Sequence, residues 1–218
     1  TAPDESTPVQ PPRPTPPVSA RPKVLSVTQI EAWMRDPYGL YASKILDLRK
    51  WEQLDAPPTA ADKGTLIHEA LERFLKEDGP VLGQPGLERL LAIGARVFED
   101  VLTQPAVYAF WGPRFQEVAR WFVANEAERR PAHQPAGLEV RGKLPLSDIG
   151  GASDFTLIAK ADRIDVRKME DGSVHAEIID YKTGTPPTKP QLEGGYAPQL
   201  PLEAVMLQAG AFEGVSPA

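Results

Sequence analysis

The sequence contains no cysteine. This absence excludes disulfide bonds, thiolate zinc sites and cysteine-ligated iron–sulfur clusters, and it is typical of proteins of the reducing cytoplasm. No apolar run approaches the roughly 20 residues that span a bilayer, and no signal peptide opens the chain, so we expect a cytoplasmic protein without a membrane segment. The sequence also lacks a Gly-x-x-x-x-Gly-Lys-Ser/Thr loop, which excludes an ATP-driven motor within this chain.

Positive charge is scarce as well. The 218 residues include 24 Lys and Arg against 30 Asp and Glu, a net charge of −6. Phosphate binding usually leaves a basic surface, so a role in nucleic-acid chemistry would depend on local basic residues, bound metal or a partner's surface. The length and the apolar content of 41% are sufficient for one sizeable globular domain plus a tail.

The first 23 residues lack the composition of a folded segment. Proline occurs eight times among mostly small and polar residues, so we expect 1–23 to be a disordered, semi-rigid tether. A docking peptide for a proline-binding module is the alternative, but no basic residue flanks a clean PxxP core. Because the chain opens on a tether and ends abruptly at 216–218, we expect a piece of a longer protein whose ordered domain spans 24–218.

Hydrophobic periodicity predicts helices first, then strands, then a final helix. Thr28 and Glu31 have the spacing of a capping box at the first helix, which Pro37 should end. This order predicts an α/β (α+β) domain with a helical N-terminal part and a small mixed sheet flanked by helices. The predicted helices span 28–36, 38–48, 61–77, 86–103, 113–130 and 200–211, and the predicted strands lie within 137–180.

Two strand patterns, 156–168 and 174–182, are joined by a segment containing Asp171-Gly172. Asp-Gly favours a two-residue turn that would pair Glu170 with Ser173 and send Asp162 and Asp180 to opposite faces. The apolar residues contradict that turn because they are even-numbered on both strands, which requires even-with-even pairing. The even-numbered set is Ile158, Ile164, Val166, Val174, Ala176 and Ile178.

We therefore predict a three-residue loop, 170–172, with Gly172 in the left-handed conformation. In this register Asp162 lies opposite Asp180. The odd-numbered charged residues should then form a solvent-facing outer surface of cross-strand pairs. These residues are Arg163, Asp165, Arg167, His175 and Glu177.

Asp180 and Lys182 are two residues apart on a strand and therefore share one face, with the Tyr181 ring on the other. Two acids side by side repel unless a cation lies between them, and hard cations prefer oxygen ligands. With Asp162 on the same face, the functional interpretation is a Mg²⁺ or Mn²⁺ site with Lys182 directed at a phosphate. The structural alternative is a solvated hairpin whose acids lie beside Lys160 and Lys182. Spacing alone supports both equally; the shared face with buried residues favours the site.

Four further residues have two interpretations each. His68 lies on the apolar stripe of its predicted helix, where a histidine is usually a packed core residue; the alternative is a metal ligand. Gly64, one turn earlier, would allow close approach of backbone or DNA. Glu139 either lines the site or is a solvated strand charge. Gln199 either donates to a phosphate or caps its own helix.

The motifs and their order resemble those of RecB-like nucleases of the PD-(D/E)xK superfamily. The segments Ser26–Glu31 and Asp36-Pro37-Tyr38 resemble the opening of the nuclease domain of AddB, a subunit of the AddAB helicase–nuclease. The resemblance covers about 24–212 and implies a restriction-endonuclease-like core. The motifs that carry it are Gly64-x-x-x-His68, Lys160-Ala161-Asp162-Arg163-Ile164-Asp165, Asp180-Tyr181-Lys182-Thr183-Gly184 and Gln199.

The resemblance implies a role for each site residue. His68, Asp162, Asp180 and the main-chain carbonyl of Tyr181 would bind Mg²⁺ or Mn²⁺. Asp162, Asp180 and Lys182 would be catalytic, with Lys182 positioning or activating water. Gln199, Gly64 and Lys160 would contact the substrate.

Two departures from the family pattern stand out. Many AddB-type nucleases carry cysteines for an iron–sulfur cluster, the first just before the Pro-Tyr, where this chain has Asp36. We therefore expect a variant without the cluster. The tyrosine that usually follows the glutamine by four residues is Glu203 here, which affects the expected DNA contacts but not the metal chemistry.

The expected function is a metal-dependent deoxyribonuclease of exonuclease type. It would process double-strand break ends for recombinational repair, acting on a single strand of unwound DNA beside an AddA-like helicase–nuclease subunit. A catalytically silent module for DNA binding or subunit contacts is the alternative. A stand-alone RecB-like exonuclease is disfavoured by the tether and the abrupt end.

Overall fold

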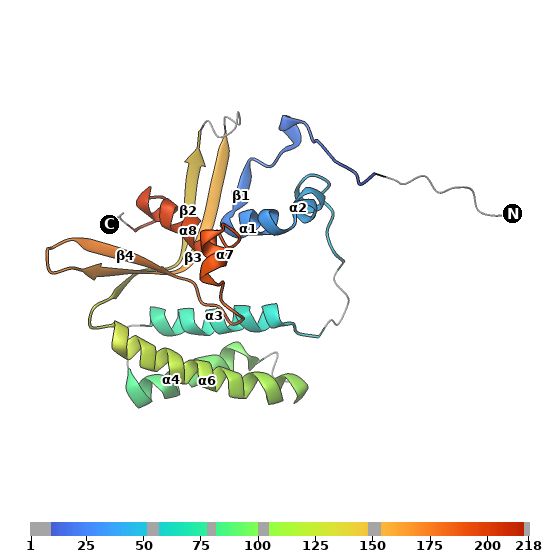
Figure 1. Cartoon of the computed structure of the whole chain (residues 1–218). Coiled ribbons are helices and arrows are strands. Elements are labelled where there is room, and N and C mark those ends of the chain that lie inside the picture. Colours follow the sequence, from blue (N-terminus) through green and yellow to red (C-terminus); the bar gives the residue numbers. More distant parts are fainter. Residues whose placement is uncertain (1–9, 52–56, 78–81, 100–104, 148–153, 216–218) are drawn as a thin grey trace.

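The structure is a computed structural model that describes residues 10–51, 57–77, 82–99, 105–147 and 154–215 (Figure 1). The helices in these ranges are α1 (Val27–Arg35), α2 (Pro37–Lys44), α3 (Ala60–Lys76), α4 (Gly83–Val97), α6 (Pro105–Arg129), α7 (Lys189–Glu193) and α8 (Gln199–Gln208), with a 3-10 turn at η1 (Val18–Ala20). The strands are β1 (Val24–Ser26), β2 (Gln134–Leu146), β3 (Phe155–Lys168) and β4 (Val174–Ile179).

The strands form one mixed sheet around β3. β1 pairs with β3 in parallel, whereas β2 and β4 pair with it antiparallel. β1 and β4 join different halves of β3, so β3 contacts all three other strands. The predicted small mixed sheet flanked by helices is confirmed.

The hairpin between β3 and β4 has the predicted register. Ile164 pairs with Ile178, and Lys168 pairs with Val174, so even-numbered residues oppose even-numbered ones. Gly172 has a φ of 84°, and Met169 N donates to Ser173 O at 2.8 Å, which closes the three-residue loop. The two-residue Asp-Gly turn is therefore absent, and the register leads directly to Asp162 and Asp180 beyond the last pair.

The prediction of a charged outer face is correct for Arg167, His175 and Glu177, which are exposed, and wrong for two residues of β3. Arg163 and Asp165 are both 0% exposed because α6 covers that face. Arg163 donates to Asp165 and Glu126, and Arg129 contacts Asp165 and Glu177. The centre of this group is buried, and its outer member Glu177 is 44% exposed. We call these five residues the buried ion network: Glu126, Arg129, Arg163, Asp165 and Glu177.

The buried parity also differs in the first half of β3. Ile158 was expected inside but is 38% exposed, whereas Leu157, Ala159 and Ala161 are buried against α1 and α8. Ile164 is buried as predicted, with Arg163 and Asp165 buried on the opposite face, whereas Val174 of the predicted even set is 41% exposed. A single parity therefore does not describe a 14-residue strand whose two halves have different neighbours.

The helices α3, α4 and α6 form a separate layer, in which α3 lies nearest the sheet (Figure 1). α3, α4 and α6 share a core around Leu71, Phe74, Ile93 and Phe122. α4 and α6 approach closely because Gly94 has no side chain: a Cβ there would lie 2.0 Å from the Phe115 ring. This packing fixes α3 and therefore the position of the residues that it presents to β3.

Several predicted helix ends are wrong. The capping box at α1 uses Ser26 and Gln29, which exchange hydrogen bonds of 3.1 and 3.0 Å, and not Thr28 and Glu31. α6 begins at Pro105, because Pro113 lies inside the helix and does not start it. α4 begins at Gly83, and the short α7 was not predicted.

Some predictions fall partly outside the described residues: the end of helix 86–103, residues 1–9 of the tether and the chain end at 216–218. Across the described residues, no helix combines the length and the apolar character needed to cross a membrane.

Candidate metal centre

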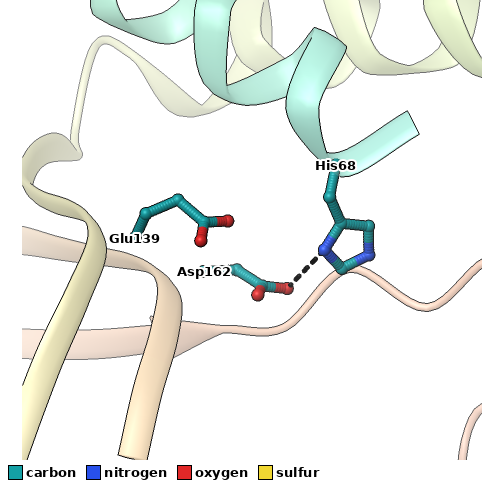
Figure 2. Close-up of side chains that lie close together, drawn as sticks. All are labelled: His68, Glu139 and Asp162. Atoms are coloured by element: carbon teal, nitrogen blue, oxygen red, sulfur yellow. Dashed lines mark ion pairs between the residues drawn. The ribbon is translucent and has the colours of Figure 1, made fainter. Parts of the chain in front are cut away.

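α3 places His68 over the sheet. Its first turn is closed by a capping box in which Thr59 N donates to the Asp62 carboxylate (2.7 Å) and Asp62 N donates to Thr59 Oγ1 (3.3 Å). Ile67 and Leu71 are buried in the helical layer and fix the rotation of α3. His68, beside Ile67, is directed toward β3 (Figure 2).

Both ring nitrogens of His68 meet predicted ligands. Nδ1 lies 3.4 Å from Asp162 Oδ2, and Nε2 lies 2.5 Å from the main-chain carbonyl oxygen of Tyr181. The same Asp162 oxygen accepts a hydrogen bond from Tyr181 N at 2.8 Å. The structure thus brings three of the four predicted ligands together, although their binding of metal stays a prediction.

The charge around His68 favours its protonated form. A hydrogen bond to Asp162 raises the pKa of His68, the charge of Asp162 and the Tyr181 carbonyl add to this, and partial burial opposes it. A proton on each ring nitrogen then satisfies both oxygen acceptors. A cation in the same place would satisfy them in an equivalent way.

Glu139 joins this group from β2. His68, Glu139 and Asp162 each offer one donor atom, and these atoms lie within 4.8 Å of one another (Figure 2). Glu139 has a φ of 53°, a strained conformation for a residue with a side chain, next to a register shift between Pro135 and Gly137. Such strain concentrates at functional sites. Of the two interpretations of Glu139, the position supports a lining residue and not a solvated strand charge.

Asp180 and Lys182 form an ion pair beside this group. Lys182 Nζ lies 2.7 Å from Asp180 Oδ2 and donates to Gln199 Oε1 at 3.0 Å. Gln199 Nε2 donates to Asp180 Oδ1 at 3.1 Å. Gln199, at the start of α8, therefore holds both charged residues and does not cap its helix through its side chain.

Glu203 follows Gln199 by one helical turn and is 1% exposed. Its Oε1 accepts a hydrogen bond from Gln199 Nε2 at 3.3 Å, and its Oε2 has no hydrogen-bond partner among the described residues. Burial raises the pKa of Glu203 to about 7, and the charges of Asp180 and Asp162 contribute to the rise. A buried carboxyl with a near-neutral pKa is typical of functional sites.

The donor atoms suit a hard divalent cation. The described candidates are an imidazole nitrogen, carboxylate oxygens and one main-chain carbonyl, without a thiolate. More carboxylates converge than the neighbouring lysines neutralise, because Lys160 pairs with Glu139 and Lys182 with Asp180, which leaves Asp162 to His68. With His68 protonated, Glu203 is the carboxyl left without a cationic partner among the described residues, and a cation such as the predicted Mg²⁺ or Mn²⁺ could take the place of the His68 proton.

The remaining predicted residues lie at the edge of the site. Lys160 is exposed and ion-paired with Glu139. At Gly64 a Cβ would lie 3.2 Å from Thr183 Oγ1, so the missing side chain lets α3 lie against the segment that follows β4. Whether Lys160 or Gly64 contacts DNA stays a prediction.

Glu203 and the buried ion network show what the sequence did not reveal. Glu203 lies four residues after Gln199, and this spacing alone indicates a shared helix face. Its burial depends on how α8 packs on the sheet, which no local pattern encodes. The five members of the ion network come from α6, β3 and β4, so no spacing along the chain connects them.

Comparisons with known proteins agree with this architecture. The model of the PD-(D/E)XK nuclease superfamily matches residues 24–218. An uncharacterized protein of Rickettsia felis is 36% identical over 195 residues, which cover 88% of this chain and 22% of that protein. An uncharacterized protein of Rickettsia conorii is 35% identical over 195 residues, which cover 88% of this chain and 23% of that protein.

A more distant relative has a functional name. This protein of Clostridium acetobutylicum, named as a subunit of an ATP-dependent helicase/deoxyribonuclease, is 26% identical over 179 residues, which cover 73% of this chain and 15% of that protein. The chain spans about a fifth of the length of the Rickettsia relatives that it matches. Because the family model covers the whole of 24–218, the chain belongs to the PD-(D/E)XK nuclease superfamily.

Proposed function

We propose that this chain is a DNA nuclease that hydrolyses phosphodiester bonds with Mg²⁺ or Mn²⁺, as an exonuclease-type hydrolase. The observation that carries the proposal is the convergence of His68 and Asp162 beside the Asp180–Lys182 ion pair. Membership of a nuclease superfamily supports the same chemistry.

In this proposal the cation is held by His68, Asp162, Asp180 and the Tyr181 carbonyl, with Glu139 as a further candidate ligand. A divalent ion bound there supplies a polarised water and neutralises charge on the phosphoryl oxygens. The chain's own residues then have to hold the substrate and Lys182 in place.

In this proposal the ammonium of Lys182 contacts the phosphate or positions the attacking water. Its ammonium is fixed between Asp180 and Gln199, and a compact ammonium suits either partner. Gln199 accepts a hydrogen bond from Lys182 and donates one to Asp180, so its amide holds the two charged side chains in fixed positions relative to each other. A direct contact between Gln199 and DNA would require it to exchange one of these hydrogen bonds.

We further infer a role in processing double-strand break ends, on a single strand of unwound DNA and in complex with an AddA-like helicase–nuclease. The support is the likeness to two proteins named as subunits of an ATP-dependent helicase/deoxyribonuclease, at 26% and 27% identity. The charge of −6 is compatible with a partner that supplies the main DNA-binding surface.

The test is cleavage of end-labelled single-stranded DNA in Mg²⁺ or Mn²⁺ by the wild type, Asp180→Asn and Lys182→Met. Each substitution should lower the rate at least about a hundredfold, because it removes a ligand or a group that stabilises developing charge. Product length over time separates exonuclease from endonuclease cleavage.

Two exposed residues provide matched controls. Asp154→Asn and Lys189→Met remove the same charges away from the site and should leave the rate unchanged. Equal cleavage by the wild type and Asp180→Asn would reject catalysis at this site. DNA binding without cleavage by the wild type would favour the silent module.

A further inference from the structure

A hollow of about 400 Å³ lies directly beside Lys182, on the α6 side. Such a volume is within the range of ligand pockets in proteins, roughly 300–1,000 Å³. Its walls come from the helical layer, from Arg163 of β3 and Ile179 of β4, and from the segment that follows β4; Glu126 and Arg129 of the buried ion network line it as well. The residues used below are Ile67, Leu71, Val118, Trp121, Asn125 and Lys182.

One large aromatic side chain lines this hollow and faces solvent. Trp121 is 59% exposed, whereas the next residue, Phe122, is buried in the helical core. Val118, Trp121 and Asn125 are three and four residues apart and therefore share one face of α6. The helix thus presents a flat apolar ring, with an amide one turn further on, at the edge of the candidate site.

The charge of the site favours a DNA contact that does not depend on phosphates. The chain has a net charge of −6, and both lysines next to the metal ligands are ion-paired with carboxylates. Attraction of this chain to phosphates is then weak, so its own hold on the DNA near the site has to come from another interaction. Stacking of a base on an aromatic ring supplies affinity without depending on charge or sequence.

We propose that this hollow is a nucleobase site, in which an unpaired base next to the cleaved phosphate stacks on Trp121. Ile67, Leu71 and Val118 form the apolar wall, and Asn125 offers a donor and an acceptor to the edge of the base. Duplex DNA does not offer a free base unless it is flipped out of the stack, so this site selects single-stranded DNA. The inference rests on the proposed nuclease function, because Lys182 places the phosphate.

The test measures binding without cleavage, using the chain in Ca²⁺ in place of Mg²⁺ or Mn²⁺. The probes are a 12-nucleotide single strand, a hairpin duplex of the same sequence, and a set of single strands that each lack one base. Trp121→Ala should weaken single-strand binding about tenfold or more, and Trp121→Phe should weaken it much less. Duplex binding should be the same in all variants.

The strands that lack one base identify the stacked position. For the wild type, one missing base should weaken binding about as much as Trp121→Ala does, and the two changes together should add little. Base stacking should also quench indole fluorescence in the wild type and much less in Trp121→Phe.

Trp33 on α1 provides the matched control. It is 48% exposed and does not line the hollow. Trp33→Ala should leave binding unchanged. Because about half of each side chain is covered, both variants should lower the unfolding temperature by similar small amounts, so a loss of binding in Trp121→Ala alone is not a loss of folding. Equal losses in Trp33→Ala and Trp121→Ala, an equal loss on duplex DNA, or no loss at all would overturn the nucleobase site.

The two proposals fail in different ways. Single-strand binding that depends on Trp121, without cleavage in Mg²⁺ or Mn²⁺, would reject the nuclease function and retain the base site. Cleavage that Trp121→Ala leaves intact, with unchanged binding, would reject the base site alone and leave Trp121 as a surface for another protein.

Discussion

Neighbouring residues of β3, Asp162 and Arg163, belong to two charge clusters that are built differently. In the buried ion network, Arg129 and Arg163 are enclosed by three carboxylates at hydrogen-bonding distance. At the candidate metal centre, four carboxylates meet two lysines and a histidine, and one buried oxygen of Glu203 has no partner among the described residues.

The difference indicates what each cluster is for. The network joins α6 to β3 and β4, and each of its carboxylates has an arginine partner. Arg130, which pairs with Glu126 at 2.9 Å, brings the count to three arginines for three carboxylates. Arg129 Nε has no hydrogen-bond partner among the described residues. At the candidate metal centre the buried carboxyl of Glu203 has no cationic partner among the described residues, so we expect a cation or a proton to stabilise this cluster. The two clusters should therefore respond differently to substitution.

The largest effect should come from the network. Arg163→Met leaves Glu126 and Asp165 buried without their main cation, which should lower the free energy of unfolding by about 3–5 kcal/mol. Urea unfolding measures this. Arg167→Met, on the same strand but exposed, should change it by about 0.5 kcal/mol or less. A loss below about 1 kcal/mol for Arg163→Met would show that the network is not structural.

At the candidate metal centre, the stability of the folded chain should fall as a carboxyl group becomes charged. The pKa of Glu203 is raised by burial from 4.5 to about 7, so the folded state holds this proton more tightly than the unfolded chain. The contribution of Glu203 to stability is therefore complete below about pH 4.5 and is lost as the pH rises through 7. The loss is on the order of 3 kcal/mol.

Glu203→Gln removes this titration and keeps the size of the side chain. In a chelator, the variant should match the wild type near pH 4.5 and be more stable at pH 8, measured by urea unfolding at each pH. Glu177, in the network, behaves conversely: the hydrogen bond from Arg129 lowers the pKa of Glu177, so its contribution is lost at acid pH. A difference between Glu203→Gln and the wild type that does not change with pH would contradict this view of Glu203.

Metal should stabilise the second cluster and not the first. At a Mn²⁺ concentration a hundredfold above its Kd, the free energy of unfolding should rise by about 2.7 kcal/mol. Asp162→Asn should lose most of this gain, whereas Glu170→Gln, an exposed acid in the hairpin loop, should keep it. A full gain in Asp162→Asn would place the ion elsewhere.

The sequence predicted the features of the two clusters that depend on the alternation of residues along neighbouring strands. Even-numbered apolar residues on two strands were sufficient for the β3–β4 register, and the register placed Asp162 opposite Asp180. The register follows from periodicity and spacing, which the chain encodes directly. The place of His68 beside Asp162 did not: its helix pattern favoured a packed core residue, and only the resemblance to RecB-like nucleases implied a residue near Asp162.

The same pattern failed where a distant element decides burial. Arg163 and Asp165 have the alternation of an outer face, but α6 covers them and supplies Glu126 and Arg129. For Glu139 the sequence left two interpretations open, because its positive φ and its place beside His68 and Asp162 depend on the tertiary fold.

Tyr181 belongs to both clusters and gives the smallest effect. Its hydroxyl accepts a hydrogen bond from Arg163 at 3.2 Å, its ring packs on Phe122, and its carbonyl meets His68. Burial raises the pKa of Tyr181 to about 12, so the hydroxyl is neutral at physiological pH. Tyr181→Phe should lower the free energy of unfolding by only about 1 kcal/mol and leave cleavage near the wild-type rate, because the carbonyl belongs to the main chain.

Tyr181→Ala also removes the ring and should reduce both stability and cleavage, because the carbonyl loses the packing that holds it near His68. Unfolding and cleavage measured on both variants separate the two roles of the residue. If Tyr181→Phe lost as much cleavage as Tyr181→Ala, the hydroxyl itself would act at the metal centre. The two clusters would then be one functional unit, joined through Arg163.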